Sequence, residues 1–153
     1  MVGGGKCLFH QLDLTKPHMV HYQTEENLTI EEFRTILINS TLGERRPIDE
    51  PDRLTKMLQH GNLIITARQD GKLIGVARSL TDFTYCTYLS DLAVHEAYQK
   101  RGIGKELIRL TKLATPKAKL ILLSAPKAVN YYPRIGMTKW DQCYVLDHVS
   151  DLK

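Results

Sequence analysis

The sequence predicts an α/β protein that is built on one mixed sheet with helices on its faces. Two observations lead to this prediction. Short runs rich in β-branched or apolar residues recur along the chain, and segments with the periodicity of amphipathic helices lie between several of them. The chain has 153 residues, of which 42% are hydrophobic and 25% charged, which fits one compact, soluble domain.

The first third of the chain is expected to form one strand and two helices. Residues 19–23 match a short strand. Thr29, followed three residues later by Glu32, forms a capping box that predicts a helix start, and apolar residues continue this helix toward Ser40. A second helix is expected over residues 51–60, because this segment begins with proline and is followed by glycine.

A β-hairpin and a longer strand are predicted next. Residues 63–68 are rich in the β-branched residues that favour strands, and Asp70-Gly71 is a strong signal for a two-residue hairpin turn. Residues 73–77 would form the return strand. Residues 85–94 would form a further strand of the same sheet.

The second half of the chain is expected to contain two helices and three strands. Apolar residues at helical spacing predict a helix that ends at Thr115-Pro116: Ile103, Leu107, Leu110 and Leu113. Residues 120–123 are all apolar, which predicts a central strand that is buried on both sides. A short helix at residues 127–134 and an antiparallel strand pair, 137–140 with 142–146, complete the prediction.

Residues 1–17 are interpreted as a leader, and residues 18–153 as a single domain. The start of the chain lacks the apolar stretch of a secretory signal, and no apolar run approaches membrane-spanning length, so no membrane partner is expected. Three cysteines, Cys7, Cys86 and Cys143, form no C-x-x-C pair, which predicts reduced thiols in a cytoplasmic protein. Cys86 lies in a strand-like run and is expected to be buried.

Charge and histidine patterns limit the classes of ligand. The six histidines show no metal-binding spacing, so no metal site is expected. Between His95 and Lys119, seven Lys and Arg side chains face only two Glu side chains, whereas the whole chain carries +4. Such a patch attracts a polyanion: nucleic acid, a membrane surface or a phosphate-rich cofactor. Aromatic residues do not interleave with these charges, which disfavours nucleic acid, and a solvated helix face explains the later charges of this segment equally well.

Residues 89–105 carry the most informative pattern, because a strand there leads through a polar loop to a helix that starts at two glycines, Gly102 and Gly104. The first turn of a helix leaves N–H groups unpaired, and glycine lets a ligand approach the backbone closely. Lys100, Arg101 and Lys105 add positive charge. From these residues alone, a phosphate site and an ordinary helix start are equally good interpretations. The dinucleotide G-x-G-x-x-G and Walker-type patterns are both absent.

A family resemblance favours the phosphate site. Residues 91–94, Asp-Leu-Ala-Val, followed by residues 99–104, Gln-Lys-Arg-Gly-Ile-Gly, resemble the signature Q/R-x-x-G-x-G/A of the GNAT superfamily of N-acetyltransferases. Residues 128–137 resemble the later tyrosine motif of that family. Two motifs in the right order are far more specific than one, and the resemblance extends from about residue 18 to the end. It implies a GNAT-like mixed, mostly antiparallel sheet of six to seven strands with helices on both faces.

The resemblance also implies roles for individual residues. Acetyl-CoA would be the cosubstrate, with its pyrophosphate at residues 99–105 and its pantetheine arm along residues 92–94. The implied cofactor-binding residues are Leu92, Ala93, Val94, Gln99, Lys100, Arg101, Gly102, Ile103, Gly104 and Lys105. A primary amine, on a small molecule or a peptide, would attack the thioester directly, and Tyr132 would protonate the departing thiolate.

Several points stay open at this stage. The general base is either Asp91 or a water chain, and Asp91 is equally well interpreted as a structural carboxylate. An asparagine that the family often has before the tyrosine motif is replaced by Ala125 or a neighbour, and Met137 stands where a phenylalanine is usual. A non-catalytic acyl-CoA-binding or regulatory module is the alternative function, although Tyr132 argues against it. The resemblance is also compatible with a homodimer formed through the late strands.

Overall fold

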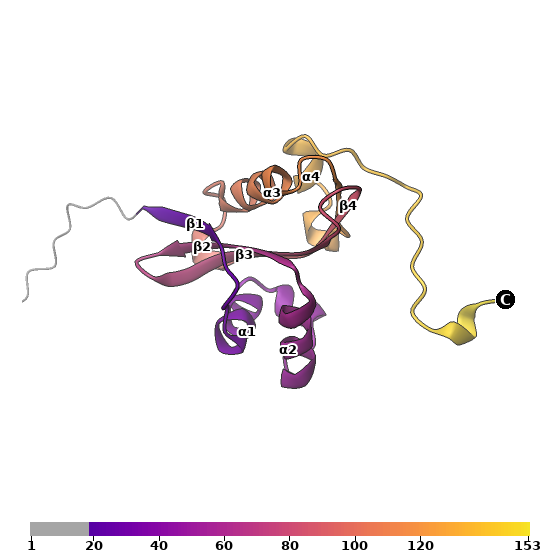
Figure 1. Cartoon of the computed structure of the whole chain (residues 1–153), viewed down its shortest axis with the longest axis horizontal. Coiled ribbons are helices and arrows are strands. Elements are labelled where there is room, and N and C mark those ends of the chain that lie inside the picture. Colours follow the sequence, from indigo (N-terminus) through magenta and orange to yellow (C-terminus); the bar gives the residue numbers. More distant parts are fainter. Residues whose placement is uncertain (1–18) are drawn as a thin grey trace, which may run out of the picture.

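The computed structural model describes residues 19–153, so the expected leader and Cys7 lie outside the described residues. The elements follow the chain as shown in Figure 1. The strands are β1 (Val20–Thr24), β2 (Leu63–Gln69), β3 (Lys72–Thr81), β4 (Cys86–Val94) and β5 (Lys119–Ile121). The helices are α1 (Ile30–Asn39), α2 (Pro51–His60), α3 (Ile103–Ala114) and α4 (Tyr131–Arg134), and the short 3-10 turns are η1 (Leu42–Arg45), η2 (Glu96–Tyr98), η3 (Pro126–Ala128) and η4 (Val149–Asp151).

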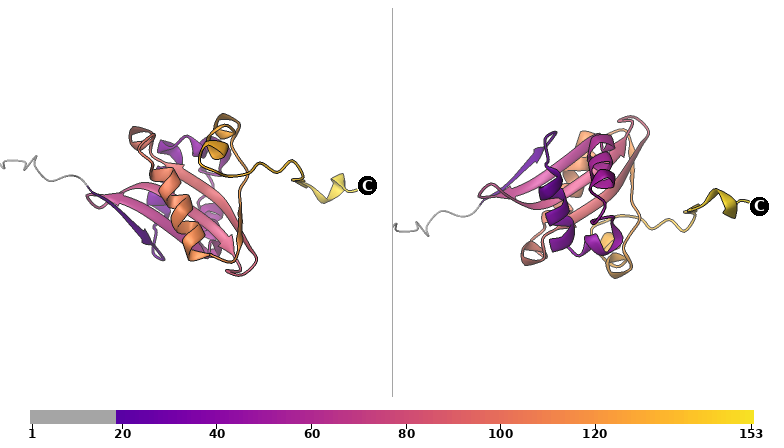
Figure 2. Two further views of the ribbon diagram at one scale, coloured as in Figure 1. Left: turned by 90° about the horizontal axis from the view of Figure 1, so that it is seen from above. Right: turned by 90° about the horizontal axis from the view of Figure 1, so that it is seen from below.

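One mixed sheet forms the centre of the molecule, with the strand order β1-β2-β3-β4-β5. The first four strands are antiparallel, and β5 pairs parallel to β4. Helices α1 and α2 cover one face and α3 covers the other, as the views in Figures 1 and 2 show. The mixed α/β fold with helices on both faces is therefore confirmed, whereas the expected six to seven strands are not, since residues 19–153 contain five.

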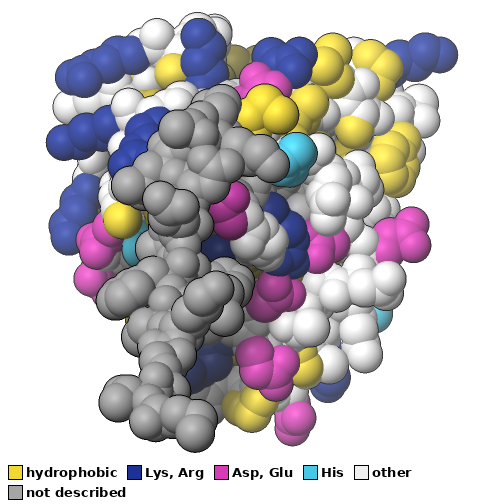
Figure 3. All heavy atoms as spheres, turned by 90° about the vertical axis from the view of Figure 1, so that its left-hand side faces the viewer, with side chains coloured by type: hydrophobic (Ala, Val, Ile, Leu, Met, Phe, Trp, Pro, Cys, Tyr) yellow, Lys and Arg dark blue, Asp and Glu magenta, His cyan; other side chains and the backbone are white. Residues whose placement is uncertain are grey.

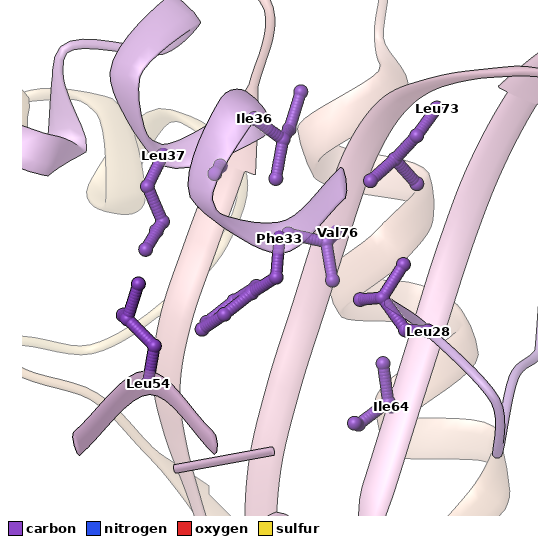
Figure 4. Close-up of a cluster of buried hydrophobic side chains, with 9 residues drawn as sticks. Leu28, Phe33, Ile36, Leu37, Leu54, Ile64, Leu73 and Val76 are labelled. Carbon is purple, nitrogen blue, oxygen red and sulfur yellow. The ribbon is translucent and has the colours of Figure 1, made fainter. Parts of the chain in front are cut away.

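Two apolar clusters attach the helices to the sheet. On the α1 and α2 face, Phe33 is fully buried beside the strand residue Val76, and Leu54 of α2 points toward Leu37 of α1 (Figure 4). On the opposite face, Ile103 and Leu107 of α3 pack on the other set of alternating strand residues. Strands β2 and β3 thus contribute to both clusters, which explains why most of their side chains are buried.

The local start and turn signals are confirmed. The backbone N–H of Glu32 donates to Oγ1 of Thr29 over 3.2 Å, as the capping box predicts. Asp70 and Gly71 both have positive φ angles, 50° and 79°, which matches the hairpin turn expected at this dipeptide. These signals depend only on residues close in the chain, so they survive in the folded protein.

The prediction of a buried central strand at residues 120–123 was wrong. Strand β5 ends at Ile121 and is the last strand of the sheet described for residues 19–153. Ile121 and Leu123 are 46% and 50% exposed. Their neighbours Leu120 and Leu122 pack on the α3 side, so the run is buried on one face only.

The predicted final strand pair was also wrong, because residues 137–148 form no strand. Trp140 packs near the start of β5, with Nζ of Lys119 4.3 Å from its ring centroid. Beyond this contact the chain leaves the body of the domain (Figures 1 and 2), and Tyr144 is 92% exposed. The apolar residues of this segment therefore lack the sheet neighbour that a strand requires.

Three smaller expectations also change. Cys86 is the first residue of β4 and is exposed rather than buried, and Cys143 is a free, exposed cysteine. Leu113 is 60% exposed, because the buried face of α3 runs through Ile103, Leu107 and Thr111 and does not include it. The helix expected over residues 127–134 is divided into η3 and α4.

No helix within residues 19–153 has the length and apolar character needed to cross a bilayer. The face shown in Figure 3 carries acidic as well as basic side chains. Within the same residues, no group of three potential metal ligands occurs.

Candidate active site

A cleft of about 910 Å³ lies at the end of β4, where five segments of the chain meet. Its walls come from η1 and its flanking residues, the second half of β4, the loop that leads into α3, the residues after β5, and α4. These segments are separated by up to about 90 residues in the sequence. The cleft therefore exists only in the folded protein, although both sequence motifs contribute to it.

Strand β4 presents an edge without a strand partner to this cleft, and side chains bond two of its carbonyls, those of Ser90 and Val94. Its parallel pairing with β5 covers only Cys86 to Tyr88, so residues 89–94 have no β5 partner among the described residues. Leu92 and Val94 line the cleft. Ala93 points to the opposite face, where it is 1% exposed in the α1 cluster. An extended ligand could thus take the place of a strand beside β4.

The loop after β4 ends in a cluster of free N–H groups. The first helical hydrogen bond of α3 runs from the N–H of Glu106 to the carbonyl of Gly102, so the N–H groups of residues 103–105 precede it. Gly102 has a φ of 82° and Lys100 a φ of 62°, which curls the loop around this point. The side chains of Lys100 and Lys105 line the same part of the cleft. The chemistry of this loop fits a pyrophosphate.

Two residues of the predicted loop have other contacts. The Gln99 side chain donates to the carbonyl of Val94 over 2.9 Å, which ties the loop to the end of β4. The Arg101 guanidinium stacks over the Tyr98 ring at 5.2 Å and does not line the cleft. The other predicted cofactor-binding residues line the cleft, apart from Ala93.

Two adjacent tyrosines on α4 close the cleft opposite β4. The rings of Tyr131 and Tyr132 pack edge to face, with centroids 5.3 Å apart. Burial, and then the neighbouring Tyr131, raise the pKa of Tyr132 above its usual value. Tyr132 therefore stays protonated at neutral pH, as a proton donor must. Tyr131 reaches the start of α3, because a Cβ added to Gly104 would lie 3.3 Å from its hydroxyl.

Asp91 is a structural carboxylate in this fold. Its side chain is fully buried and forms ion pairs with Arg46 and with Arg78, the latter at 2.5 Å. It does not line the cleft. Strand alternation thus turns the Asp91 side chain away from the cleft.

The residues around η1 also form part of the site, although sequence reasoning gave none of them an individual role. Glu44, Arg45 and Arg46 line the cleft, and Glu44 is the one carboxylate among its described lining residues. No local signal could have placed them there, because their position depends on the packing of η1 against β4, more than 40 residues away in the chain. Ala125 also lines the cleft, at the place where the family often has asparagine.

Residues 27–137 match the family model described as acetyltransferase (GNAT) family. The chain belongs to this family. A curated relative, an uncharacterized N-acetyltransferase of Pyropia yezoensis, is 25% identical over 127 residues, which cover 78% of this chain and 71% of the relative. This GNAT protein is therefore an acetyltransferase, and acetyl-CoA is the acyl donor that the family uses.

Solved structures show the same fold. A GNAT-family acetyltransferase from Streptococcus pneumoniae superposes with a TM-score of 0.69 at 19% identity, covering 85% of this chain and 100% of that one. An aminoglycoside N-acetyltransferase in complex with CoA gives a TM-score of 0.68 at 16% identity, with 89% and 99% covered. At these identities the likeness concerns the fold alone.

Proposed function

We propose that this GNAT protein transfers the acetyl group of acetyl-CoA to a primary amine by direct attack of the amine on the thioester. One observation carries the proposal: the part of β4 without a strand partner, the N–H groups that precede Glu106 and the residue Tyr132 all belong to one cleft. An acyltransferase of this kind needs a site for an extended thioester, an anion site and a proton donor, and the cleft offers all three.

The cosubstrate would bind along β4 and at the start of α3. The N–H groups of residues 103–105, with Lys100 and Lys105, would hold the pyrophosphate by hydrogen bonds and charge. The pantetheine arm would lie along Leu92 and Val94 and pair with the part of the β4 backbone that β5 does not cover, as a strand pairs with a sheet edge. A backbone N–H at this place would polarise the thioester carbonyl.

The chemistry balances with one proton donor. The lone pair of the neutral amine attacks the thioester carbon, a tetrahedral intermediate forms, and the carbon–sulfur bond breaks. Tyr132 gives its proton to the departing thiolate, and the proton released from the amine nitrogen restores the tyrosine or passes to water. Because Asp91 is buried between two arginines, no proton step is assigned to it.

The acceptor is proposed to be an amine of a small molecule or a peptide. The similarity to an aminoglycoside N-acetyltransferase supports the small-molecule class, although it concerns the fold alone. Glu44 lines the cleft, and its carboxylate would attract an amine that also carries a second cationic group. The non-catalytic alternative is not favoured, because a binding module needs no proton donor.

A thiol-release assay tests this proposal. The purified protein is incubated with acetyl-CoA and a panel of polyamines, amino acids, aminoglycosides and peptides, and the free CoA thiol is measured. Amine-dependent release that falls in Tyr132→Phe is expected. Binding of acetyl-CoA with no release for any amine class would instead support the non-catalytic module.

We also propose that the chain forms a homodimer through its late segments. Residues 120–123 and 143–146 are two apolar runs, and each lacks a neighbour on at least one side among residues 19–153. Pairing residues 142–146 of one protomer with the outer edge of β5 in its partner would bury both runs. Trp140, just before this segment, contacts Lys119 at the start of β5 in its own protomer.

Sedimentation velocity over a range of concentrations tests the dimer. Val145→Pro removes an N–H that a strand would use and should shift the protein toward monomer. Val149→Pro is the matched control, because Val149 is the first residue of η4, where proline is tolerated. A wild-type monomer at all concentrations, or a dimer that Val145→Pro leaves intact, would contradict this interface.

A further inference from the structure

A buried cluster of three charged side chains lies behind the wall of the cleft. It consists of Asp91 from β4, Arg78 from β3 and Arg46, the residue after η1. The Asp91 side chain is fully buried, and the side chains of Arg78 and Arg46 are 6% and 20% exposed. Within residues 19–153 no ion pair joins either arginine to a second acid. Two guanidinium groups therefore share one carboxylate, and one positive charge is left over.

The Arg46 guanidinium is held rigidly. Its Nε donates to Asp91, its Nη2 donates to the carbonyl of Ser90 over 2.7 Å, and its Nη1 donates to the carbonyl of Arg45 over 2.8 Å. Arg78 reinforces the arrangement, because its Nη2 donates to the hydroxyl of Ser90 over 2.9 Å. With all three nitrogens bonded, the charge of Arg46 has one fixed position.

This position lies next to the part of β4 where transfer would occur. The β3–β4 register shifts at Ser90, since Arg78 pairs with Asp91 while Ser79 pairs with Leu89, so Ser90 is the extra residue of a β-bulge. Leu92 follows two residues later and lines the cleft, as do Ser90 and Arg46. Two residues of a strand span about 7 Å, which is the distance along β4 from Ser90 to Leu92. Because Arg46 bonds the carbonyl of Ser90, its charge acts on the part of the cleft beside Leu92 at short range.

We propose that Arg46 is a positioning residue that makes the acceptor bind as a neutral amine, by holding a fixed positive charge beside the place of attack. The inference rests on the proposed acetyl transfer to an amine. A nearby like charge disfavours the ammonium form, and only the neutral amine has the lone pair that attacks the thioester. Arg46 thereby supplies part of what a general base would supply, in a site whose one nearby buried carboxylate, Asp91, is already paired.

The other charged groups of the cleft act more weakly or elsewhere. Glu44 and Arg45 are neighbours of opposite sign and are exposed, so water screens them. Lys100 and Lys105 lie at the anion end, where the phosphates of the cosubstrate would neutralise them, and Lys127 is exposed. The other polar aromatic residues of the cleft are Tyr88, Tyr98, Tyr131 and Tyr132. Burial raises the pKa of Tyr131 and of Tyr132 above the usual value, so neither carries a charge near pH 7. The guanidinium of Arg46 is the fixed, largely buried charge of the set.

The pH dependence of kcat tests the inference, with L-lysine, spermidine and kanamycin as acceptor probes. The acidic limb of kcat reports ionisation in the ternary complex. Arg46→Gln should move this limb upward by about one pH unit, because the ammonium form is no longer disfavoured. Arg46→Lys keeps the charge and should leave the limb in place even where turnover falls. Arg45→Gln removes the same charge from an exposed neighbour and should shift the limb little.

Other outcomes would overturn the inference. A uniform fall of kcat in Arg46→Gln with an unmoved limb would assign Arg46 a structural role only. An equal shift in Arg46→Lys would exclude its charge as the cause. A second measurement needs no turnover. The binding of L-lysine, spermidine and kanamycin to the CoA-loaded protein is measured by calorimetry in two buffers of different ionisation enthalpy, which gives the number of protons released on binding. The wild type should release a proton, and Arg46→Gln should release a smaller fraction of one. Binding without proton release refutes this inference alone, whereas no binding and no turnover refute the proposed function with it.

Discussion

Arg78 and Asp91 face each other across the β3–β4 ladder, with Nε of Arg78 2.5 Å from Oδ2 of Asp91. The pair is almost fully buried, and Arg46 closes the other side of the carboxylate. A buried carboxylate that holds two guanidinium groups stabilises the fold near the cleft. The same bonds keep it from serving as a base.

Replacing Asp91 tests this structural role. Asp91→Asn leaves two buried arginines without their acid, so the free energy of unfolding should fall by about 3–5 kcal/mol. Urea unfolding at neutral pH measures the loss. Asp49→Asn is the control, since Asp49 is 89% exposed and should change stability little. If Asp91→Asn is as stable as the wild type but has lost turnover, Asp91 acts as the general base and not as a structural carboxylate.

Gly104 tests the pyrophosphate site. Acetyl-CoA should raise the thermal midpoint of the wild type, because a ligand that binds only the folded state stabilises it. In Gly104→Val the added Cβ would meet the Tyr131 hydroxyl and obstruct the loop N–H groups, so most of the ligand-induced shift should disappear. Ala114→Val adds a β-branched residue at the exposed end of the same helix and should keep the shift. If acetyl-CoA raises the thermal midpoint of Gly104→Val as much as that of the wild type, the pyrophosphate does not bind at this loop.

The lysines of the loop should act through phosphate. Neutralising Lys100 and Lys105 together should weaken CoA binding by about 10- to 100-fold and reduce its salt dependence, with little effect on a dephosphorylated pantetheine fragment. Arg101→Gln should matter less, because Arg101 stacks on Tyr98 and does not line the cleft. Calorimetric titration with both ligands decides the matter: equal losses for CoA and pantetheine would rule out a phosphate contact.

Tyr132 should contribute to turnover rather than to binding. General-acid assistance is worth roughly 10²–10⁴-fold, and a thiolate with a conjugate acid near pKa ~8.5 leaves well, so Tyr132→Phe should lose activity at the lower end of that range. Acetyl-CoA binding and the melting temperature should stay near normal, because only the hydroxyl is removed. Tyr131→Phe is the neighbouring control and should be milder in turnover. Full activity of Tyr132→Phe would make the tyrosine pair structural.

The Glu25–Arg68 ion pair should make stability depend on pH. Burial opposes ionisation of Glu25, but hydrogen bonds from Arg68 and Thr66 outweigh it and hold the pKa of the carboxyl below its usual value. The stabilisation of the folded state by the Glu25 carboxylate is therefore complete above the pKa that Glu25 has in the unfolded chain. It is lost as the pH falls through the lower pKa that Glu25 has in the folded protein.

Urea unfolding between about pH 5 and about pH 3 measures this loss. Glu25→Gln should be less stable than the wild type by about 1–2 kcal/mol at neutral pH and should show a flatter decline in acid. Glu26→Gln, at an exposed neighbour, should decline as the wild type does. If the free energy of unfolding of Glu25→Gln falls in acid as steeply as that of the wild type, other groups cause the acid sensitivity.

The sequence by itself determined the family and, up to α3, the α-helices and strands but not the short turns η1 and η2. The capping box at Thr29, the turn at Asp70-Gly71 and the periodicity around Leu107 act over a few residues, so their signals do not depend on distant neighbours. The two motifs also identified the strand, the glycine-containing helix start and the tyrosine pair, because each motif is contiguous in the chain.

Only the tertiary structure decided which apolar runs are buried and which charges meet. A run of four apolar residues, such as 120–123, looks the same in a central strand and at a sheet edge, since the difference lies in whether another strand follows. The direction of Asp91 depended on strand alternation and on a bulge at Ser90. The place of Arg46 in the cleft depended on the packing of η1 against β4, which no spacing within either segment encodes.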